Sequence, residues 1–180
     1  MKTKFFYGIA LLVACTMLTV SCKKDNTVNQ EVEVKTKATA AVLEYSFTIS
    51  DTLNMVADYT VHYYDNDGKL QSEPLNGKAW SKSFKAKLPA KLGVRVTGTP
   101  KADFDASKYD RIVLGTFFDT KAYAIDDNNK VIGESYIKSI KGTAGFSGEN
   151  FVSFLNTKNV LMTLVTFDAD GNLTVNEEWK

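Results

Sequence analysis

Apolar and polar residues alternate along most of the chain beyond residue 40, and this period of two constrains the fold more than any other feature. In the first such stretch, residues 43–49, every odd-numbered residue is apolar or aromatic and every even-numbered residue is polar. A period of two places successive side chains on opposite faces of a β-strand, so one face is expected to be buried and the other solvated. The other strands are expected at residues 57–64, 69–73, 79–88, 94–98, 111–118, 121–125, 130–140, 160–167 and 172–178.

About ten short strands separated by turns are typical of an all-β sandwich or barrel. Only residues 150–155 have a pattern that allows a turn of helix. The stretch 99–110, which contains Pro100, could divide the strands into two domains. Each would then hold about 60–70 residues, which is marginal without disulfides or metals. We therefore predict a single β-sandwich of about ten mostly antiparallel strands over residues 41–180, with residues 99–110 as a crossover.

Three turns share one design. Each begins with an aspartate, namely Asp65, Asp126 or Asp168, and ends with Gly or Asn followed by a polar and an apolar residue. An aspartate can accept local backbone hydrogen bonds, and Gly or Asn tolerates the left-handed conformation that closes such a turn. Each turn is therefore expected to connect the two strands of a β-hairpin.

The N-terminal residues have the pattern of an export signal. Lys2 and Lys4 precede an apolar run over residues 5–20, which is short for a membrane span. The pair Ser21-Cys22 that follows resembles the lipidation site of a bacterial lipoprotein signal. This resemblance implies cleavage after residue 21, a lipid on Cys22 and anchoring to the outer membrane of a Gram-negative bacterium, on its periplasmic or surface face. Cys15 is a competing lipid site, and an ordinary secretory signal is the other alternative.

Residues 22–40 are mostly polar and mixed in charge, so we expect a flexible tether between the lipid and the folded domain. A short strand at residues 31–35, where Val32 and Val34 alternate with charged residues, is the alternative. Cleavage removes two of the 22 basic residues and leaves 20 against 21 acidic ones, a net charge of −1. This balance gives no reason to expect a nucleic-acid partner, which would need a basic excess.

Few residues suggest catalysis. His62 is the chain's one histidine and lies on the polar phase of an expected strand, so we interpret it as a solvated strand residue. A zinc site is not expected, because Cys22 is the one cysteine left after cleavage. The aspartates of the turns, such as Asp65 and Asp67, have the spacing of calcium ligands, but turn formation already explains them. We therefore predict no enzymatic activity, no cofactor and no bound metal. A hydrolase built on two carboxylates is a weaker alternative.

Aromatic residues are the remaining candidates for a binding surface. Trp80 and Phe84 lie on an alternating strand and are expected in the core. Phe117 and Phe118 are adjacent, so they must point to opposite faces of a strand. Tyr64 and Trp179 fall outside the buried pattern and are expected to be exposed. Tyr64, Trp179, Phe117 and Phe118 are therefore the predicted binding residues, for a protein or a glycan.

The tripeptide Asp51-Thr52-Leu53 is similar to the short motif on which some Gram-negative bacteria attach O-glycans to exported proteins. The resemblance makes Thr52 a possible O-glycosylation site. A turn between two strands explains the same three residues equally well.

The stretch from Tyr59 through Gly68 and Trp80-Ser81-Lys82-Ser83-Phe84 to Val96 resembles small immunoglobulin-like modules of exported bacterial lipoproteins. This resemblance covers about a quarter of the chain and implies an immunoglobulin-like sandwich without a particular activity. The predicted function is therefore a lipid-anchored binding or structural module of the cell envelope. The alternative is a carrier of a small apolar ligand, with the same strands closed into a barrel around a cavity.

Overall fold

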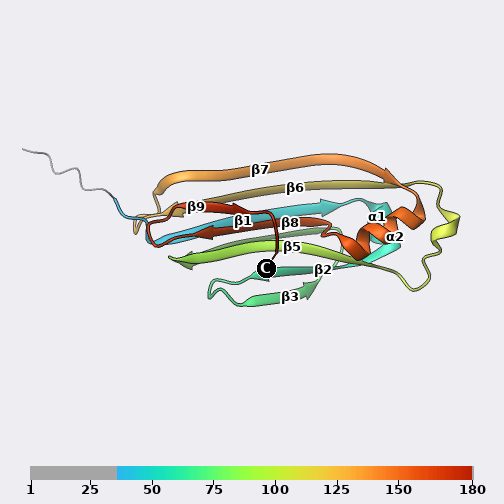
Figure 1. Cartoon of the computed structure of the whole chain (residues 1–180), viewed down its shortest axis with the longest axis horizontal. Helices are drawn as coiled ribbons and strands as arrows, with labels where there is room; N and C mark the ends of the chain where they lie inside the picture. The colour runs from blue at the N-terminus through green and yellow to red at the C-terminus, as the bar shows by residue number, and fades with distance from the viewer. Residues whose placement is uncertain (1–35, 180) are drawn as a thin grey trace, which may run out of the picture. The chain divides into compact units, whose positions relative to one another are not determined.

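The computed structural model describes residues 36–179, in which nine strands form two antiparallel sheets (Figure 1). The leader, Cys15, Cys22 and residues 22–35 of the predicted tether lie outside the described residues. Sheet A has the strand order β4-β1-β6-β7, and sheet B has the order β3-β2-β5-β8-β9. The strands are β1 (Ala40–Ile49), β2 (Ala57–Tyr64), β3 (Leu70–Pro74), β4 (Ala79–Lys87), β5 (Ala90–Pro100), β6 (Ile112–Ile125), β7 (Val131–Phe146), β8 (Leu161–Phe167) and β9 (Leu173–Asn176).

The architecture is an all-β sandwich, which confirms the fold class expected from the alternation. Nine strands form where about ten were expected, because one strand, β6, covers residues 112–125 and so joins the two strands expected at 111–118 and 121–125. Asp119 and Thr120 continue the alternation across the expected gap, with Thr120 buried between the sheets. The closed barrel of the alternative hypothesis is wrong, since the described strands form two separate sheets. Sheet A has β4 and β7 as its edge strands, and sheet B has β3 and β9. Barrel and sandwich require the same alternation, so the pattern alone could not separate them.

Two short helices lie on connections between the sheets, at the end opposite the hairpin turns (Figure 1). Helix α1 (Asp51–Val56) forms where a turn was expected, and the Ser50 side chain caps it by accepting a hydrogen bond from Leu53 N at 3.4 Å. Helix α2 (Gly148–Thr157) extends the predicted helical turn at residues 150–155 in both directions. Its apolar side is buried through Phe151 and Leu155.

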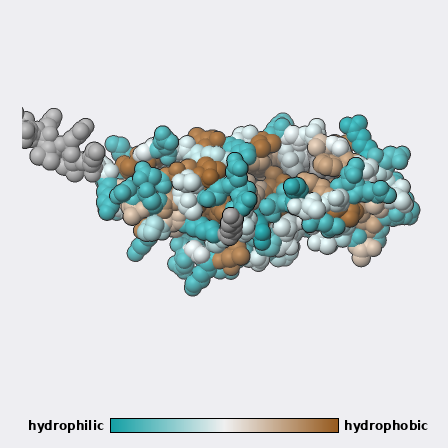
Figure 2. Space-filling model, viewed as in Figure 1, coloured by the Kyte–Doolittle hydropathy of each residue, from teal (hydrophilic) through white to brown (hydrophobic). Residues whose placement is uncertain are grey.

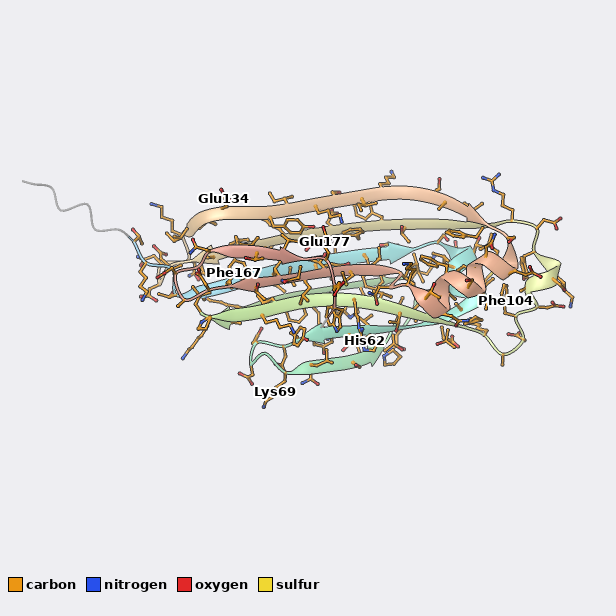
Figure 3. The ribbon with its side chains drawn as sticks, viewed as in Figure 1. His62, Lys69, Phe104, Glu134, Phe167 and Glu177 are labelled. Atoms are coloured by element: carbon orange, nitrogen blue, oxygen red, sulfur yellow. The ribbon has the colours of Figure 1, made fainter. Side chains whose placement is uncertain are left out.

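Residues 101–111, with a short 3₁₀ helix η1 (Ala106–Lys108), connect β5 in sheet B to β6 in sheet A. Phe104 attaches this crossover to helix α2 by packing edge-on against Phe151, with ring centroids 6.0 Å apart (Figure 3). The expected boundary stretch therefore contributes an aromatic side chain to the core that both sheets share.

Aromatic side chains cross the interior of the sandwich in a continuous row. Phe118 stacks on Tyr45 at 5.9 Å between centroids, Tyr45 meets Trp80 edge-on at 6.3 Å, and Trp80 lies 5.8 Å from Tyr63. This aromatic row consists of Phe118, Tyr45, Phe47, Trp80, Phe84 and Tyr63. The expected core positions of Trp80 and Phe84 are confirmed, since Phe84 is buried and Trp80 packs against the core.

A lysine covers each end of the aromatic row. Lys138 Nζ on β7 lies 5.7 Å from the ring centroid of Phe118, and Lys82 Nζ on β4 lies 4.1 Å from that of Tyr63. Both contacts have the geometry of a cation–π interaction. The two open sides of the sandwich are thus bordered by long side chains whose stems are apolar and whose heads are charged.

Three buried hydroxyl groups lie between the sheets, on Tyr45, Thr120 and Thr163. Within residues 36–179, the three hydroxyl groups make no well-aligned hydrogen bond, although the Thr163 side chain lies close to the Tyr45 hydroxyl. Burial is the main cause that raises the pKa of Tyr45 well above its ordinary value, so its hydroxyl stays protonated. The interior therefore contains uncharged polar groups within an otherwise apolar core.

The three hairpin turns have the design expected from the sequence. In each, one oxygen of the leading aspartate accepts two backbone hydrogen bonds, and Asp126 Oδ1 does so from Asn128 N at 2.9 Å and Lys130 N at 2.8 Å. Asp65 and Asp168 repeat the arrangement at 2.9–3.0 Å. The closing position has a positive φ in all three, at Gly68 (74°), Asn129 (61°) and Gly171 (87°).

Replacing Asp126 by alanine is expected to lower the free energy of unfolding by about 2 kcal/mol, because two backbone N–H groups lose a charged acceptor. Urea denaturation followed by circular dichroism measures the effect. The neighbouring Asp127 is exposed, so Asp127→Ala should change the free energy by less than about 0.5 kcal/mol. Equal effects of the two substitutions would contradict the role assigned to Asp126.

Candidate functional site

The outer face of sheet A is the broadest candidate for a binding surface. Every second residue of β1 points to this face, including exposed Glu44 and Thr48 and half-buried Ser46. The neighbouring strand β4 adds Ser81 and Ser83, which are exposed. Because these side chains are small, the strands beneath them form a shallow floor.

Two adjoining hollows follow this floor. The first has a volume of about 570 Å³ and the second about 540 Å³. Their linings share no residue but are neighbours along β1, where Ser46 belongs to the first and Thr48 to the second. We call the combined hollow the sheet A trough. Its outward-facing lining is Glu44, Ser46, Ser81, Ser83, Asp119, Lys121 and Ile137 in the first part and Thr48, Ser50, Gly115, Phe117, Lys141 and Thr143 in the second.

Phe117 is an exposed aromatic residue of the trough. Its side chain is 41% exposed, whereas that of Phe118 is 3% exposed in the core. The two rings therefore point to opposite faces of β6, as expected from their adjacency. Packing in the aromatic row accounts for Phe118, which is a core residue and not part of the candidate binding surface. On the same face as Phe117, Gly115 allows Ser50 to approach β6 closely, since a Cβ at this position would lie 3.2 Å from Ser50 Cβ.

A small polar network borders the first part of the trough. Tyr123 OH donates a hydrogen bond to Glu44 Oε1 at 2.7 Å, and Lys121 Nζ lies 4.7 Å from the ring centroid of Tyr123. The bond to the Glu44 carboxylate, together with burial, raises the pKa of Tyr123 to about 12. The network thus holds one carboxylate and one ammonium in fixed positions beside the trough.

Tyr64 and Trp179 come together on the outer face of sheet B, away from Phe117. Their rings stack with centroids 5.2 Å apart, and both side chains are half-buried, not exposed as expected. The C-terminal segment passes from β9 across β8 and β5 toward β2 (Figure 1). A Cβ at Gly93 would lie 3.1 Å from the Trp179 ring, so the glycine leaves the space that the indole occupies.

Two cations cover the remaining ring surfaces of this pair. Lys91 Nζ lies 4.5 Å from the Tyr64 centroid, and the guanidinium carbon of Arg95 lies 5.0 Å from the Trp179 centroid. The Tyr64–Trp179 pair therefore packs the C-terminus against sheet B, and it offers less open ring surface than Phe117 does. This arrangement depends on contacts between distant strands, which explains why exposure was the wrong expectation for both residues.

His62 lies on the outer face of sheet B (Figure 3). Its Nδ1 is 2.8 Å from Ser72 Oγ, and its Nε2 is 3.0 Å from Thr97 Oγ1. Burial and the nearby positive charge of Arg95 lower the pKa of His62 below its ordinary value. Both ring nitrogens are thus engaged by hydroxyl groups, an arrangement that holds the imidazole in the surface of the sheet.

The most strongly connected carboxylate was not identified from the sequence. Glu73 on β3 accepts a hydrogen bond from Lys82 Nζ at 2.7 Å, one from Tyr63 OH at 3.1 Å and one from Trp80 Nε1. The hydrogen bonds from Lys82 and Trp80 are the main causes that lower the pKa of Glu73. Because β3 belongs to sheet B and β4 to sheet A, this cluster links the two sheets at their shared side. No sequence motif marks it, since its four residues lie on three strands.

Thr52 lies half-buried in helix α1, between exposed Asp51 and buried Leu53. Asp51 Oδ1 accepts a hydrogen bond from Lys78 Nζ at 2.7 Å, which ties the start of the helix to the segment before β4. The motif similar to an O-glycosylation site is therefore part of a helix and not of a turn.

In the part of the chain that the structure describes, no three His, Cys, Asp or Glu side chains are grouped as metal ligands. Among the same residues, no helix is long and apolar enough to cross a membrane. On the face visible in Figure 2, hydrophobic patches alternate with hydrophilic residues.

No family model, no curated protein and no solved structure matches this chain. No relative therefore supplies an activity or a ligand, and a functional proposal has to rest on the surface chemistry of the chain itself.

The stability of the domain is expected to decrease as the pH falls below about 6.5, because unfolded histidine takes up a proton more readily than His62 in the folded state. The stabilising effect of neutral His62 is complete above that pH and is lost as the pH falls through the lower pKa of the folded state. Urea denaturation between pH 7.5 and 5.0 measures this slope. His62→Gln should reduce it, and an unchanged slope in that variant would contradict the assignment.

Proposed function

We propose that this chain is an exported, lipid-anchored and non-catalytic binding module of the bacterial cell envelope, and that the sheet A trough is its contact surface. The observation that carries this proposal is the exposed ring of Phe117 beside a hollow that extends along β1 and β6. Large apolar side chains at the rim of a continuous hollow are typical of interaction surfaces.

The position of the trough fits an anchored protein. The predicted lipid on Cys22 would be followed by residues 23–39, which span at most about 60 Å when extended. The chain enters β1 at the end of the sandwich where the three hairpin turns lie (Figure 1). Along β1 and the residue that follows it, the trough covers residues 44–50, so it reaches the helices at the end opposite the point where the chain enters β1.

The polar clusters of the domain support a non-catalytic role. His62 is held by two hydroxyl groups, and the Glu73 carboxylate is held by Lys82, Trp80 and Tyr63. Both arrangements connect strands. Lys82 is the one member of these two clusters that lines the trough, and its ammonium group points to Glu73.

The carrier alternative needs an apolar cavity between the sheets. The aromatic row fills this interior with rings in contact from one open side to the other. We therefore place the ligand contact on the outer face of sheet A.

Cys22→Ser is expected to move the protein from the membrane fraction to the soluble exported fraction, because the acylated sulfur would be lost. Cell fractionation followed by immunoblotting measures the distribution, and Cys15→Ser is the matched control that should leave the protein in the membrane fraction. Retention of Cys22→Ser in the membrane, or release of Cys15→Ser, would contradict anchoring through Cys22.

A photo-crosslinking phenylalanine analogue at position 117 is expected to form adducts of higher mass when intact cells that carry the anchored protein are irradiated. The same analogue at Leu70, which is 50% exposed on β3 of sheet B, is the control and should give no adduct. Adduct formation is read by immunoblotting. The absence of a specific adduct from position 117 would overturn the assignment of the trough as the contact surface.

A further inference from the structure

The charges along the trough are balanced. Glu44 and Asp119 contribute two carboxylates, and Lys121 and Lys141 contribute two ammonium groups. The fifth charged residue of the lining, Lys82, directs its ammonium to Glu73 at 2.7 Å. A ligand with a strong charge of either sign would meet as many like charges as opposite ones, so the surface is complementary to an uncharged ligand.

The other polar groups of the lining are mostly hydroxyls. Ser46, Ser81, Ser83, Thr48 and Thr143 can each donate and accept a hydrogen bond. A ligand that itself presents many hydroxyl groups would find partners along the whole floor. Neutral carbohydrate has this chemistry, with hydroxyls around the rim of each ring and apolar C–H groups on its faces.

The apolar side chains of the trough are placed at intervals along this floor. Phe117 is 41% exposed, and Ile137, which pairs with Lys121 across β6 and β7, is 69% exposed. The trough covers residues 115–121 of β6, a length of about 20 Å. This length accommodates several sugar rings in a row, and the Phe117 ring presents a flat surface for the C–H face of one of them.

The floor of the trough and the β7 edge of sheet A are unfavourable for an extended peptide. The two strands that form the floor, β1 and β6, each pair with a neighbour on both sides, so their backbone groups are already used. A peptide lying on this floor would bury its backbone N–H and C=O groups without hydrogen-bond partners from a neighbouring strand. The β7 edge also opposes strand addition, because it has a register irregularity and its Lys138 points inward over Phe118.

We propose that the ligand of the sheet A trough is a neutral polysaccharide chain, bound lengthwise along β1 and β6 with one sugar ring stacked on Phe117. This assignment rests on the function proposed above and specifies the class of ligand. Ser46, Ser81 and Ser83 contact the sugar hydroxyls, and the carboxylates of Glu44 and Asp119 accept hydrogen bonds from them.

The test uses the purified full-length protein in detergent and native gels that contain one polysaccharide each. The panel consists of neutral glucans, mannans, xylans and galactans, with polygalacturonate and heparin as anionic controls. The expected result is that at least one neutral polysaccharide retards the migration of the protein. This retardation should persist in salt of about 0.5 M, a concentration that screens interactions between surface charges. Phe117→Ala should weaken this binding by about tenfold or more, the effect typical of a central aromatic contact.

Two matched pairs of variants separate binding from folding. Leu70→Ala removes a comparably exposed apolar side chain from sheet B and should not change the retardation. Ser81→Trp fills the first part of the trough and should abolish binding, whereas Thr99→Trp, at an exposed position of β5 in sheet B, should not. All four variants, Phe117→Ala included, should keep the circular dichroism spectrum of the parent protein.

Three outcomes would overturn the carbohydrate assignment: no retardation by any neutral polysaccharide, binding to the anionic polymers alone, or retardation that Phe117→Ala and Ser81→Trp leave unchanged. A protein adduct from position 117 without such retardation would overturn the assignment while the proposed binding function stands. If neither the adduct nor the retardation is observed, the carbohydrate assignment and the proposed binding function are both overturned.

Discussion

The structure depends on the burial of one row of aromatic rings between two sheets. Phe118, Tyr45, Trp80 and Tyr63 pack from one open side of the sandwich to the other, and they come from three strands of sheet A and one of sheet B. Large aromatic side chains contribute much of the apolar area that a core removes from water. The described residues contain no cysteine, so the fold of this domain is held by such burial and not by disulfides.

This core leaves the outer faces of the sheets to contact other molecules. The two outer faces differ in a way that matters for function. On sheet B, Trp179 covers Gly93 and Tyr64 and is itself flanked by Arg95, so the chain's own C-terminus occupies the aromatic surface. On sheet A, the exposed ring of Phe117 stands beside an open hollow floored by small hydroxyl side chains. The proposed ligand surface is therefore on sheet A.

Local features of the chain were readable before the structure was known. The hairpins at Asp65, Asp126 and Asp168 follow from short-range hydrogen bonds within five residues, and the opposite orientation of Phe117 and Phe118 follows from strand geometry alone. Features that join distant segments were not readable. The sheet-linking cluster around Glu73 and the stacking of Tyr64 on Trp179 each combine residues from separate strands, and no spacing in the sequence marks them.

The sequence by itself determined that the domain is built from strands, where its hairpins turn and which phase of β1, β2 and β4 is buried, because these properties depend on neighbours within a few residues. The tertiary structure decided that the strands form two open sheets and not a barrel, that residues 112–125 make one strand, and that the outer faces of β1, β4 and β6 lie side by side. Strand order and register set these outcomes, and both depend on which distant side chains pack together in the shared core.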